Sequence, residues 1–179
     1  MQQLAILESR DKLLTAARAG DQVSFERLIE PHMAVAYRLA ATMLNDVALG
    51  EDALQEATLR AWRSIGQVRT SSNIRSWFLT IVANRCRSMR AARWWSVIRL
   101  PEAWGTQPSP ADAAVESEDL ARAMQRLSPD ERAAIFLRFY EDMNSSEVAG
   151  ALGITASAAR SRIRRALRRL RIDLDEEEA

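Results

Sequence analysis

Two residue types that commonly build active sites are nearly absent from this sequence, which has one cysteine, Cys86, and one histidine, His32. A single cysteine cannot form an internal disulfide, and the two residues together do not supply a conventional zinc ligand set. The sequence also lacks a glycine-rich phosphate loop and a Ser/His/Asp or Cys/His set. We therefore expect no enzymatic activity, no metal and no cofactor, with Cys86 in a core and His32 on a helix surface.

Long apolar runs are missing as well, and no stretch approaches the ~20 residues that a membrane-spanning helix needs. Acidic residues begin at Glu8, too early for a secretory signal peptide. With 47% hydrophobic and 27% charged residues, 6 glycines and 5 prolines, the composition is typical of a folded helical protein. The sequence thus predicts a cytoplasmic, all-α protein with no membrane insertion of its own.

Lysine is scarce, because Lys12 stands alone among 25 basic residues. Residues 57–101 carry nine arginines and no acid, and residues 148–172 carry seven arginines and no acid, so the net charge of +1 conceals two basic segments. A genome rich in G and C would explain arginine over lysine, but not the loss of acids from the same stretches. Two surfaces that bind a polyanion are the natural hypothesis.

A segment rich in proline divides the chain. Three of the five prolines lie within residues 95–117, which show no sustained helical period. We expect two small helical domains, residues 1–94 and 118–172, joined by a flexible linker, residues 95–117, and followed by an acidic tail, residues 173–179.

Helical spacing of apolar residues predicts an antiparallel bundle in the first domain. The stripe on its last helix consists of Ile74, Trp77, Phe78, Ile81, Val82, Cys86 and Met89. On the preceding helix the expected core residues are Leu54, Leu59, Trp62 and Ile65. This periodicity favours Trp77 and Phe78 as core residues rather than as platforms for stacked bases.

Capping signals predict a helix-turn-helix in the second domain. SPDE (residues 128–131) places serine at the N-cap, proline at the first helical position and glutamate at the third, and NSSE (residues 144–147) has the same design. Gly153 is expected to end one helix and Thr155 to start the next.

The helix after Thr155 is the strongest candidate for binding nucleic acid. Its expected core residues are Ala159, Ile163, Ala166, Leu167 and Leu170, which leaves exposed Arg160, Arg164, Arg165, Arg168 and Arg171. Arginines on a helix of this kind bind guanine edges in the major groove and phosphates beside it. A membrane-surface helix would need larger apolar residues opposite the arginines, and a plain solvated face would not explain the turn pattern.

Five segments follow one another in the order FERLIEPHMAVAYRLA, EDALQEATLRAWRSI, NIRSWFLTIVANRCRSMRAAR, LSPDERAAIFLRFYEDMNSSEVAGALG and ITASAARSRIRRALRRLR, with the proline-containing linker after the third. In this order they resemble the extracytoplasmic-function (ECF) group of bacterial RNA polymerase sigma factors, in the minimal two-domain form. The resemblance extends from about Asp21 to Leu170. It implies a sigma factor that binds RNA polymerase core, recognises minus-ten and minus-thirty-five promoter elements, and promotes DNA melting for transcription initiation.

The resemblance implies roles for individual residues. The helix around EDALQEATLRAW is similar to the one that docks on the clamp of the largest polymerase subunit, with the contact candidates Asp52, Gln55, Glu56 and Arg60. The candidates for minus-ten DNA are Gln67, Arg69, Ser71, Ser72, Asn73, Arg75, Asn84, Arg85, Arg87 and Arg90. The candidates for minus-thirty-five DNA are Thr155, Ser157, Arg160, Ser161, Arg164 and Arg165.

The resemblance also implies a regulator, because family members commonly bind an anti-sigma factor that covers the polymerase-binding surfaces of both domains. The linker acids Glu102, Asp112 and Glu116 would then mimic nucleic-acid charge in the polymerase cleft. The acidic tail would be a solvated end or a shield for the basic helix beside it.

One alternative is a free-standing helix-turn-helix regulator whose N-terminal domain senses a ligand or dimerises. The two hypotheses differ at EDALQEATLRAW, because a free regulator has no need of an exposed acidic and polar helix there.

Overall fold

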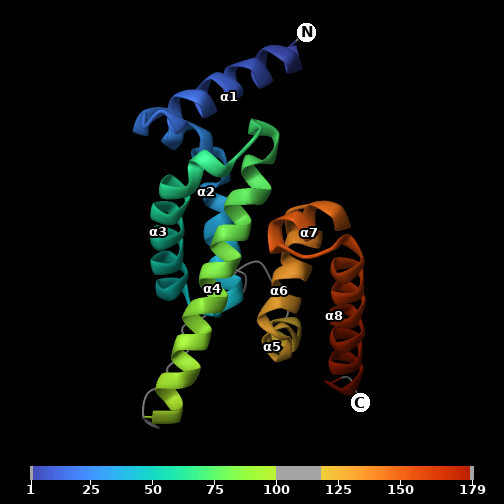
Figure 1. The fold of residues 1–179 in the computed structure, drawn as a ribbon. Coiled ribbons are helices and arrows are strands. Elements are labelled where there is room, and N and C mark those ends of the chain that lie inside the picture. Colours follow the sequence, from blue (N-terminus) through green and yellow to red (C-terminus); the bar gives the residue numbers. More distant parts are fainter. Residues whose placement is uncertain (1, 100–117, 178–179) are drawn as a thin grey trace.

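The computed structural model describes residues 2–99 and 118–177, and within these ranges the regular structure is helical, without a strand (Figure 1). The first domain consists of α1 (Gln2–Arg18), α2 (Gln22–Leu44), α3 (Val47–Ser64), the short 3-10 turns η1 (Ile65–Gln67) and η2 (Ser71–Asn73), and α4 (Ile74–Arg99). The second domain consists of α5 (Glu118–Arg126), α6 (Pro129–Ile135), the π-helical turn η4 (Phe136–Tyr140), α7 (Ser145–Leu152) and α8 (Ala156–Glu177). The expectation of an all-α fold with a helix-turn-helix domain is confirmed.

Two acidic caps start α2 and α3. The carboxylate of Asp21 accepts a hydrogen bond from the backbone N–H of Ser24, and that of Asp46 accepts one from Leu49. Asn45, between α2 and α3, adopts a left-handed conformation with φ of 53°. Asn45 and Asp46 alone therefore connect α2 to α3. Each suits its position, because asparagine tolerates a positive φ and an aspartate carboxylate caps the N-terminus of a helix.

The core of the first domain lies between α2, α3 and α4. Its fully buried side chains include Leu39, Met43, Phe78, Leu79 and Val82. Helices α2 and α3 approach closely at Gly50, where an added Cβ would lie 2.8 Å from the backbone N and Cα of Ala41. A side chain at this position would separate the two helices.

The core predictions for the first domain are largely confirmed, with one clear error. Cys86 is fully buried, and burial raises the pKa of its thiol to about 12. Leu59, expected in the core, is 56% exposed. It lies seven positions from Asp52 and four from Gln55, so it shares the polar face of α3 rather than the face that carries Leu54. His32, expected on a surface, is half-buried.

Helix α4 continues to Arg99, so the expected start of the linker at residue 95 falls inside it. Neither glycine nor proline occurs between Ile74 and Arg99, and Pro101 is the first residue that would break the helix. The remainder of the expected linker, with Glu102, Asp112 and Glu116, lies outside the described residues.

Both capping signals of the second domain are confirmed. Ser128 and Glu131 form a capping box at the start of α6, and Asn144 and Glu147 form another at the start of α7. Gly153 ends α7 with a φ of 66°. Three residues further on, α8 begins, and its turn is closed by the hydroxyl of Thr155, which accepts a hydrogen bond from the N–H of Ala158 at 3.2 Å.

The core face of α8 is narrower than expected. Ala159, Ile163, Ala166 and Leu170 are buried, whereas Leu167 is 42% exposed. The buried residues follow the spacing i, i+4, i+7, i+11, and position 167 lies at the edge of that stripe.

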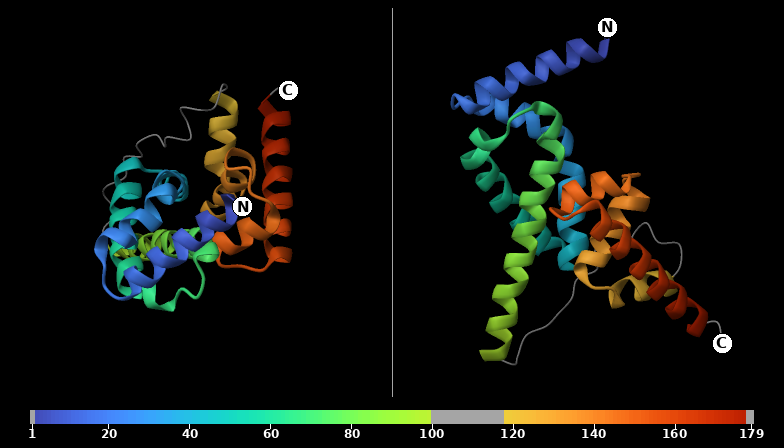
Figure 2. Two further views of the ribbon diagram at one scale, coloured as in Figure 1. Left: turned by 90° about the horizontal axis from the view of Figure 1, so that it is seen from above. Right: turned by 45° about the vertical axis from the view of Figure 1, so that its right-hand side comes forward.

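The second domain lies beside α2 and α4 of the first (Figures 1 and 2). Helix α4 of the first domain lies against α7 of the second, and α2 lies against α6. Within the described ranges, no helix has both the length and the apolar character that crossing a bilayer requires.

Candidate nucleic-acid interface

The polar loop between α3 and α4 is held by hydrogen bonds from α1. The backbone N–H of Ser71 donates to Oδ1 of Asp11 at 3.2 Å, and Arg18 donates from Nη2 to the carbonyl oxygen of Gly66 at 3.3 Å. The hydroxyls of Thr70 and Ser72 lie 2.7 Å apart. This bracing by α1 was not part of the sequence-based interpretation, and local sequence patterns carry no signal for it, because Asp11 and Ser71 are 60 positions apart.

A pocket of about 400 Å³ lies beside this loop. Three of the loop residues expected to bind minus-ten DNA line it, together with residues of the first two turns of α4 and one residue of α7. The lining residues are Gln67, Val68, Arg69, Asn73, Ser76, Trp77, Thr80 and Gly150. Trp77 is half-buried, so it belongs to both the core and the pocket wall. Ser72 is exposed. Ser71 is only 2% exposed, so the side chain of Ser71 is buried inside the loop.

The expected minus-ten arginines on α4 point in different directions. Arg85 pairs with Glu56 of α3, whereas Arg75 pairs with Glu141 of the second domain at 3.9 Å. Arg90 is exposed and lines a second pocket of about 310 Å³ that Asp130 closes from α6. These residues therefore do not form one uninterrupted basic surface in this arrangement.

Arg87 has the densest set of contacts among these residues. It donates to Oδ1 of Asn84 at 2.8 Å, to Oδ1 of Asp130 at 3.1 Å and to the carbonyl oxygen of Leu152 at 3.1 Å. Two of these three acceptors belong to the second domain. Arg87 and Asn84, both expected at the minus-ten DNA, are thus joined to each other and to α6 and α7.

The expected polymerase contacts lie together on one exposed face of α3, which we call the α3 face: Asp52, Gln55, Glu56, Leu59 and Arg60. Leu59 is the residue of this face that sequence reasoning missed, and its spacing from Asp52 and Gln55 was the signal that could have found it. An apolar side chain at the centre of a polar rim is the usual composition of a protein-binding surface.

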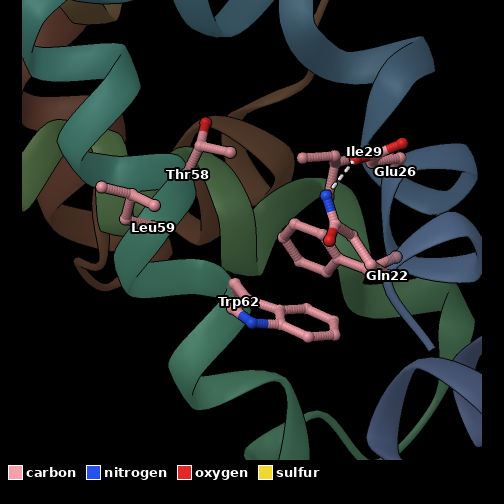
Figure 3. A pocket seen from close by; sticks show the side chains of 7 residues that line it. Gln22, Glu26, Ile29, Thr58, Leu59 and Trp62 are labelled. Atoms are coloured by element: carbon pink, nitrogen blue, oxygen red, sulfur yellow. Dashed lines mark hydrogen bonds between the residues drawn. The ribbon is translucent and has the colours of Figure 1, made fainter. Parts of the chain in front are cut away.

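A pocket of about 290 Å³ adjoins the α3 face (Figure 3). The rings of Phe25 and Trp62 form one wall, with centroids 5.1 Å apart at 62°, and the side chains of Thr58 and Leu59 form another. The dashed line in Figure 3 marks the hydrogen bond that Gln22 donates to Glu26 at the rim. A partner that binds the α3 face could therefore insert an apolar side chain into this pocket.

The expected minus-thirty-five residues lie along the first part of α8. Those that are exposed are Thr155, Ser157, Arg160, Arg164 and Arg165, and Ser161 is half-buried. Two other arginines of this helix pair with acids of α6. Arg162 lies 3.7 Å from Asp130, and Arg169 lies 2.7 Å from Glu131. The basic helix thus divides its arginines between an open face and the anchoring of α8 on α6.

The pKa values of Glu131 and His32 are shifted, each with a clear cause. Burial alone would raise the pKa of Glu131, but hydrogen bonds from Ser128 and the charge of Arg169 outweigh it, so the pKa is lowered. Burial, aided by the charges of Arg75 and Arg10, lowers the pKa of His32 to about 4. Glu131 is therefore ionised and His32 neutral at pH 7.

Sequence comparisons match both halves of the chain to known families. Residues 28–96 match the family described as Sigma-70 region 2, and residues 117–170 match Sigma-70 region 4. The ECF RNA polymerase sigma factor SigL of Mycobacterium tuberculosis is 32% identical over 171 residues, which cover 91% of this chain and 96% of the relative. The RNA polymerase sigma factor CarQ of Myxococcus xanthus is 34% identical over 86% of this chain and 91% of its own length.

Solved structures resemble the whole helical arrangement. The sigma factor RpoE of Bartonella quintana, solved in complex with the anti-sigma factor NepR, has a TM-score of 0.69 at 23% identity, covering 84% of this chain and 96% of its own. CnrH, solved in complex with the cytosolic domain of CnrY, has a TM-score of 0.65 at 25% identity, covering 94% of this chain and 98% of its own. The fold described above is shared with both.

Proposed function

The chain belongs to the ECF group of RNA polymerase sigma factors, and on that basis we propose which of its surfaces bind the polymerase and which bind the promoter. As a sigma factor it confers promoter specificity on RNA polymerase. The alternative of a free-standing regulator is not favoured, because a region 2 match and a region 4 match follow each other in the chain and the relatives span both.

The α3 face binds the clamp of the largest polymerase subunit. The observation that carries this assignment is the exposure of Asp52, Gln55, Glu56 and Arg60 around the exposed Leu59, next to a pocket walled by Phe25 and Trp62. Polar residues around an apolar centre provide both orientation and buried area in a complex.

The loop at residues 66–73 and the pocket beside it bind the minus-ten element. A base that leaves the duplex must be held well enough to offset the few kcal/mol of its lost pairing and stacking. Gln67, Arg69 and Asn73 supply hydrogen-bonding groups at the rim, and Trp77 supplies an aromatic wall. Arg75, Asn84, Arg85, Arg87 and Arg90 then contact the backbone of the adjoining DNA.

The open face of α8 binds the minus-thirty-five element. Ser157, Arg160, Ser161 and Arg164 lie near the start of the second helix of a helix-turn-helix, the part that enters a major groove. Thr155 closes the first turn of α8, and Arg165 lies beside these residues for contact with phosphate.

The proposed domains are region 2-like, residues 1–94, and region 4-like, residues 118–172. The chain acts by binding alone, without enzymatic activity of its own, in the cytoplasm. Two structurally similar proteins, the sigma factor RpoE and CnrH, were solved with bound partners, and the partner of RpoE is named an anti-sigma factor, which supports an anti-sigma partner for this chain.

A pull-down with purified core RNA polymerase tests the proposal. The wild-type chain is expected to bind, and the variant Asp52→Arg/Gln55→Ala is expected to lose binding. Glu51→Arg is the matched control, because Glu51 is also an exposed acid of α3 but lies about 100° around the helix from Asp52. If the wild-type chain binds core polymerase, the next experiment is a run-off transcription assay with the reconstituted holoenzyme. Absence of polymerase binding, with salt-sensitive duplex DNA affinity intact, would favour the free-standing regulator.

A further inference from the structure

Helix α1 lies across the end of the first domain where the loop assigned to minus-ten DNA runs from α3 to α4 (Figure 1). Arg18 donates to the carbonyl oxygen of Gly66 at the start of this loop, and Asp11 accepts the backbone N–H of Ser71 near its end. Asp11 and Arg18 are seven positions apart and so share one face of α1. Leu14, on the same face between them, is buried in the core. One face of α1 thus fixes both ends of the loop.

Asp11 takes the place of a local N-cap. Ser71 starts the 3-10 turn η2, which continues directly into α4, so its N–H is one of the donors that a helix start leaves unpaired. Thr70, the N-cap residue of η2, makes no side-chain cap, and its hydroxyl lies 2.7 Å from that of Ser72. The caps of α2 and α3 come from the residue directly before each helix, whereas this donor is bound by a residue 60 positions away. The end of the loop is therefore fixed by α1 and not by a neighbouring side chain.

Both anchored positions adjoin residues that line the pocket beside the loop. Gln67 and Arg69 follow the anchored carbonyl of Gly66, and Asn73 comes two residues after the anchored N–H of Ser71. The side chains of these three pocket residues are exposed, so they are available to an incoming base. A shift of either anchor would move the hydrogen-bonding groups that the pocket offers.

We propose that Asp11 and Arg18 are positioning residues for the capture of the minus-ten base: they hold the loop in the conformation that receives the base, without contacting the base themselves. This inference rests on the proposed function and extends it to α1, which lies before the region 2 match at residues 28–96. A loop that is already fixed loses less conformational entropy when it binds, so the base is held more tightly.

Charge alone makes the opposite prediction for Asp11. An exposed acid beside a DNA-binding loop repels phosphate, so its removal should strengthen DNA binding. Loss of the bond to Ser71 should instead weaken capture of the base. Asp11→Ala and Asp11→Asn separate the two effects, because both remove the charge but only asparagine keeps an oxygen that can accept the N–H.

The test uses holoenzyme reconstituted from the full-length chain and core RNA polymerase. The probe is fork-junction DNA with a single-stranded minus-ten overhang, taken from a promoter that the wild-type holoenzyme selects from a random-sequence library. Asp11→Ala should bind this DNA about fivefold more weakly than wild type, which is the loss expected for one net hydrogen bond. Asp11→Asn should bind it as the wild type does. Because Asp11 is exposed, both variants are expected to fold, and thermal unfolding verifies this.

Abasic probes distinguish positioning of the base from a general loss of stability. An abasic nucleotide replaces each base of the overhang in turn, and the position where it weakens wild-type binding most is that of the captured base. With this probe, Asp11→Ala and wild type should bind equally, because the pocket then has no base to hold. A loss that persists unchanged on the abasic probe would overturn the inference.

Arg18→Ala tests the other anchor. Removal of a cation weakens binding to every probe alike, so the positioning effect is the part of the loss that the abasic nucleotide abolishes. Lys12→Ala is the matched control, since it removes an exposed cation from the same helix. Its effect should be equal on the intact and abasic probes. The same ratio of intact to abasic binding in Arg18→Ala and Lys12→Ala would contradict a positioning role for Arg18.

The remaining outcomes separate this inference from the proposed function. Equal or tighter binding by Asp11→Ala would overturn the inference alone. An equal loss in Asp11→Asn and Asp11→Ala would also overturn it, because the change that they share is the loss of charge. If the wild-type chain fails to bind core polymerase, the proposed function fails and the inference fails with it.

Discussion

Arg85 donates a hydrogen bond from Nη2 to Oε1 of Glu56 at 2.6 Å, and so joins a residue assigned to promoter DNA with one assigned to the polymerase. Arg85 comes from α4 and Glu56 from the α3 face, and their side chains are 29% and 54% exposed. The two proposed binding surfaces of the first domain therefore meet at this pair. A partner that takes one member releases the other.

Because the Glu56 carboxylate is 54% exposed and so stays hydrated, we expect this pair to contribute little to folding. A double-mutant cycle with Glu56→Gln and Arg85→Gln should give a coupling free energy below about 1 kcal/mol in urea unfolding. Arg85→Gln should nevertheless weaken binding of the holoenzyme to fork-junction DNA. A coupling of several kcal/mol would instead make the pair a structural element of the bundle.

Leu59 should matter for polymerase binding and not for stability. Leu59→Ser removes an exposed apolar side chain from the α3 face, so the free energy of unfolding should stay within about 0.5 kcal/mol of wild type. Affinity for core polymerase should fall roughly tenfold, the effect of losing about 1–2 kcal/mol of interface contact. Leu167→Ser changes an exposed leucine of the second domain and provides the comparison. An equal loss in both variants would refute a specific role for Leu59.

Gly50→Ala should destabilise the first domain. The new Cβ would lie 2.8 Å from backbone atoms of Ala41, so α2 and α3 would have to move apart at a cost of about 2 kcal/mol. Gly66→Ala is the control, since a Cβ there has no neighbour within 4 Å. Thermal unfolding of the two variants measures the difference, and equal midpoints would mean that the α2–α3 contact is looser than described.

The stability of the chain should depend on His32 in mildly acidic solution. The unfolded chain protonates His32 near its ordinary pKa of 6.5, but the folded chain does so only near 4. The free energy of unfolding therefore decreases as the pH falls from 6.5 towards 4, and His32 has no such effect above 6.5. Solvent screening of this half-buried group limits the loss to about 1–2 kcal/mol.

His32→Gln isolates that contribution from the carboxylates that titrate in the same range. Urea unfolding of the variant should depend less steeply on pH than that of the wild type. Parallel curves for the two proteins would mean that His32 is protonated equally readily in both states.

Cys86 should resist alkylation in the folded chain. Its thiol is fully buried with a pKa near 12, and the thiolate is the reactive form. Mass spectrometry after iodoacetamide treatment at neutral pH should find Cys86 unmodified, and modification should appear once urea unfolds the chain. Rapid labelling of the native protein would reveal frequent opening of the α4 packing.

Local signals predicted local structure well. The capping boxes at Ser128 and Asn144 and the left-handed turn at Gly153 depend on residues within a few positions of each other, so a short window contains the whole interaction. The same applies to the buried stripe of α4, whose period is visible in the sequence.

Contacts between residues far apart in the sequence were not predictable in this way. Glu141 pairs with Arg38 across 103 positions, and helical periodicity does not specify which arginine an acid will meet. Leu59 was misplaced because its apolar character was weighed above its position on the polar face of α3. Ser71 was expected at DNA, but its backbone N–H donates to the carboxylate of Asp11 and its side chain is buried inside the loop. The assignments to individual DNA contacts stay predictions.

Glu131 links helices α6 and α8. A single oxygen, Oε2, accepts hydrogen bonds from the N–H and hydroxyl of Ser128 at the start of α6 and from Arg169 in the second half of α8. A helix as short as α6 is marginal by itself, so it depends on that cap. Fraying of α6 would release Arg169, and displacement of α8 would leave a buried carboxylate without its cation. Helices α6 and α8 should therefore unfold together as one cooperative unit. Glu131, a capping residue of α6, thus stabilises the position of α8, the helix that reads DNA.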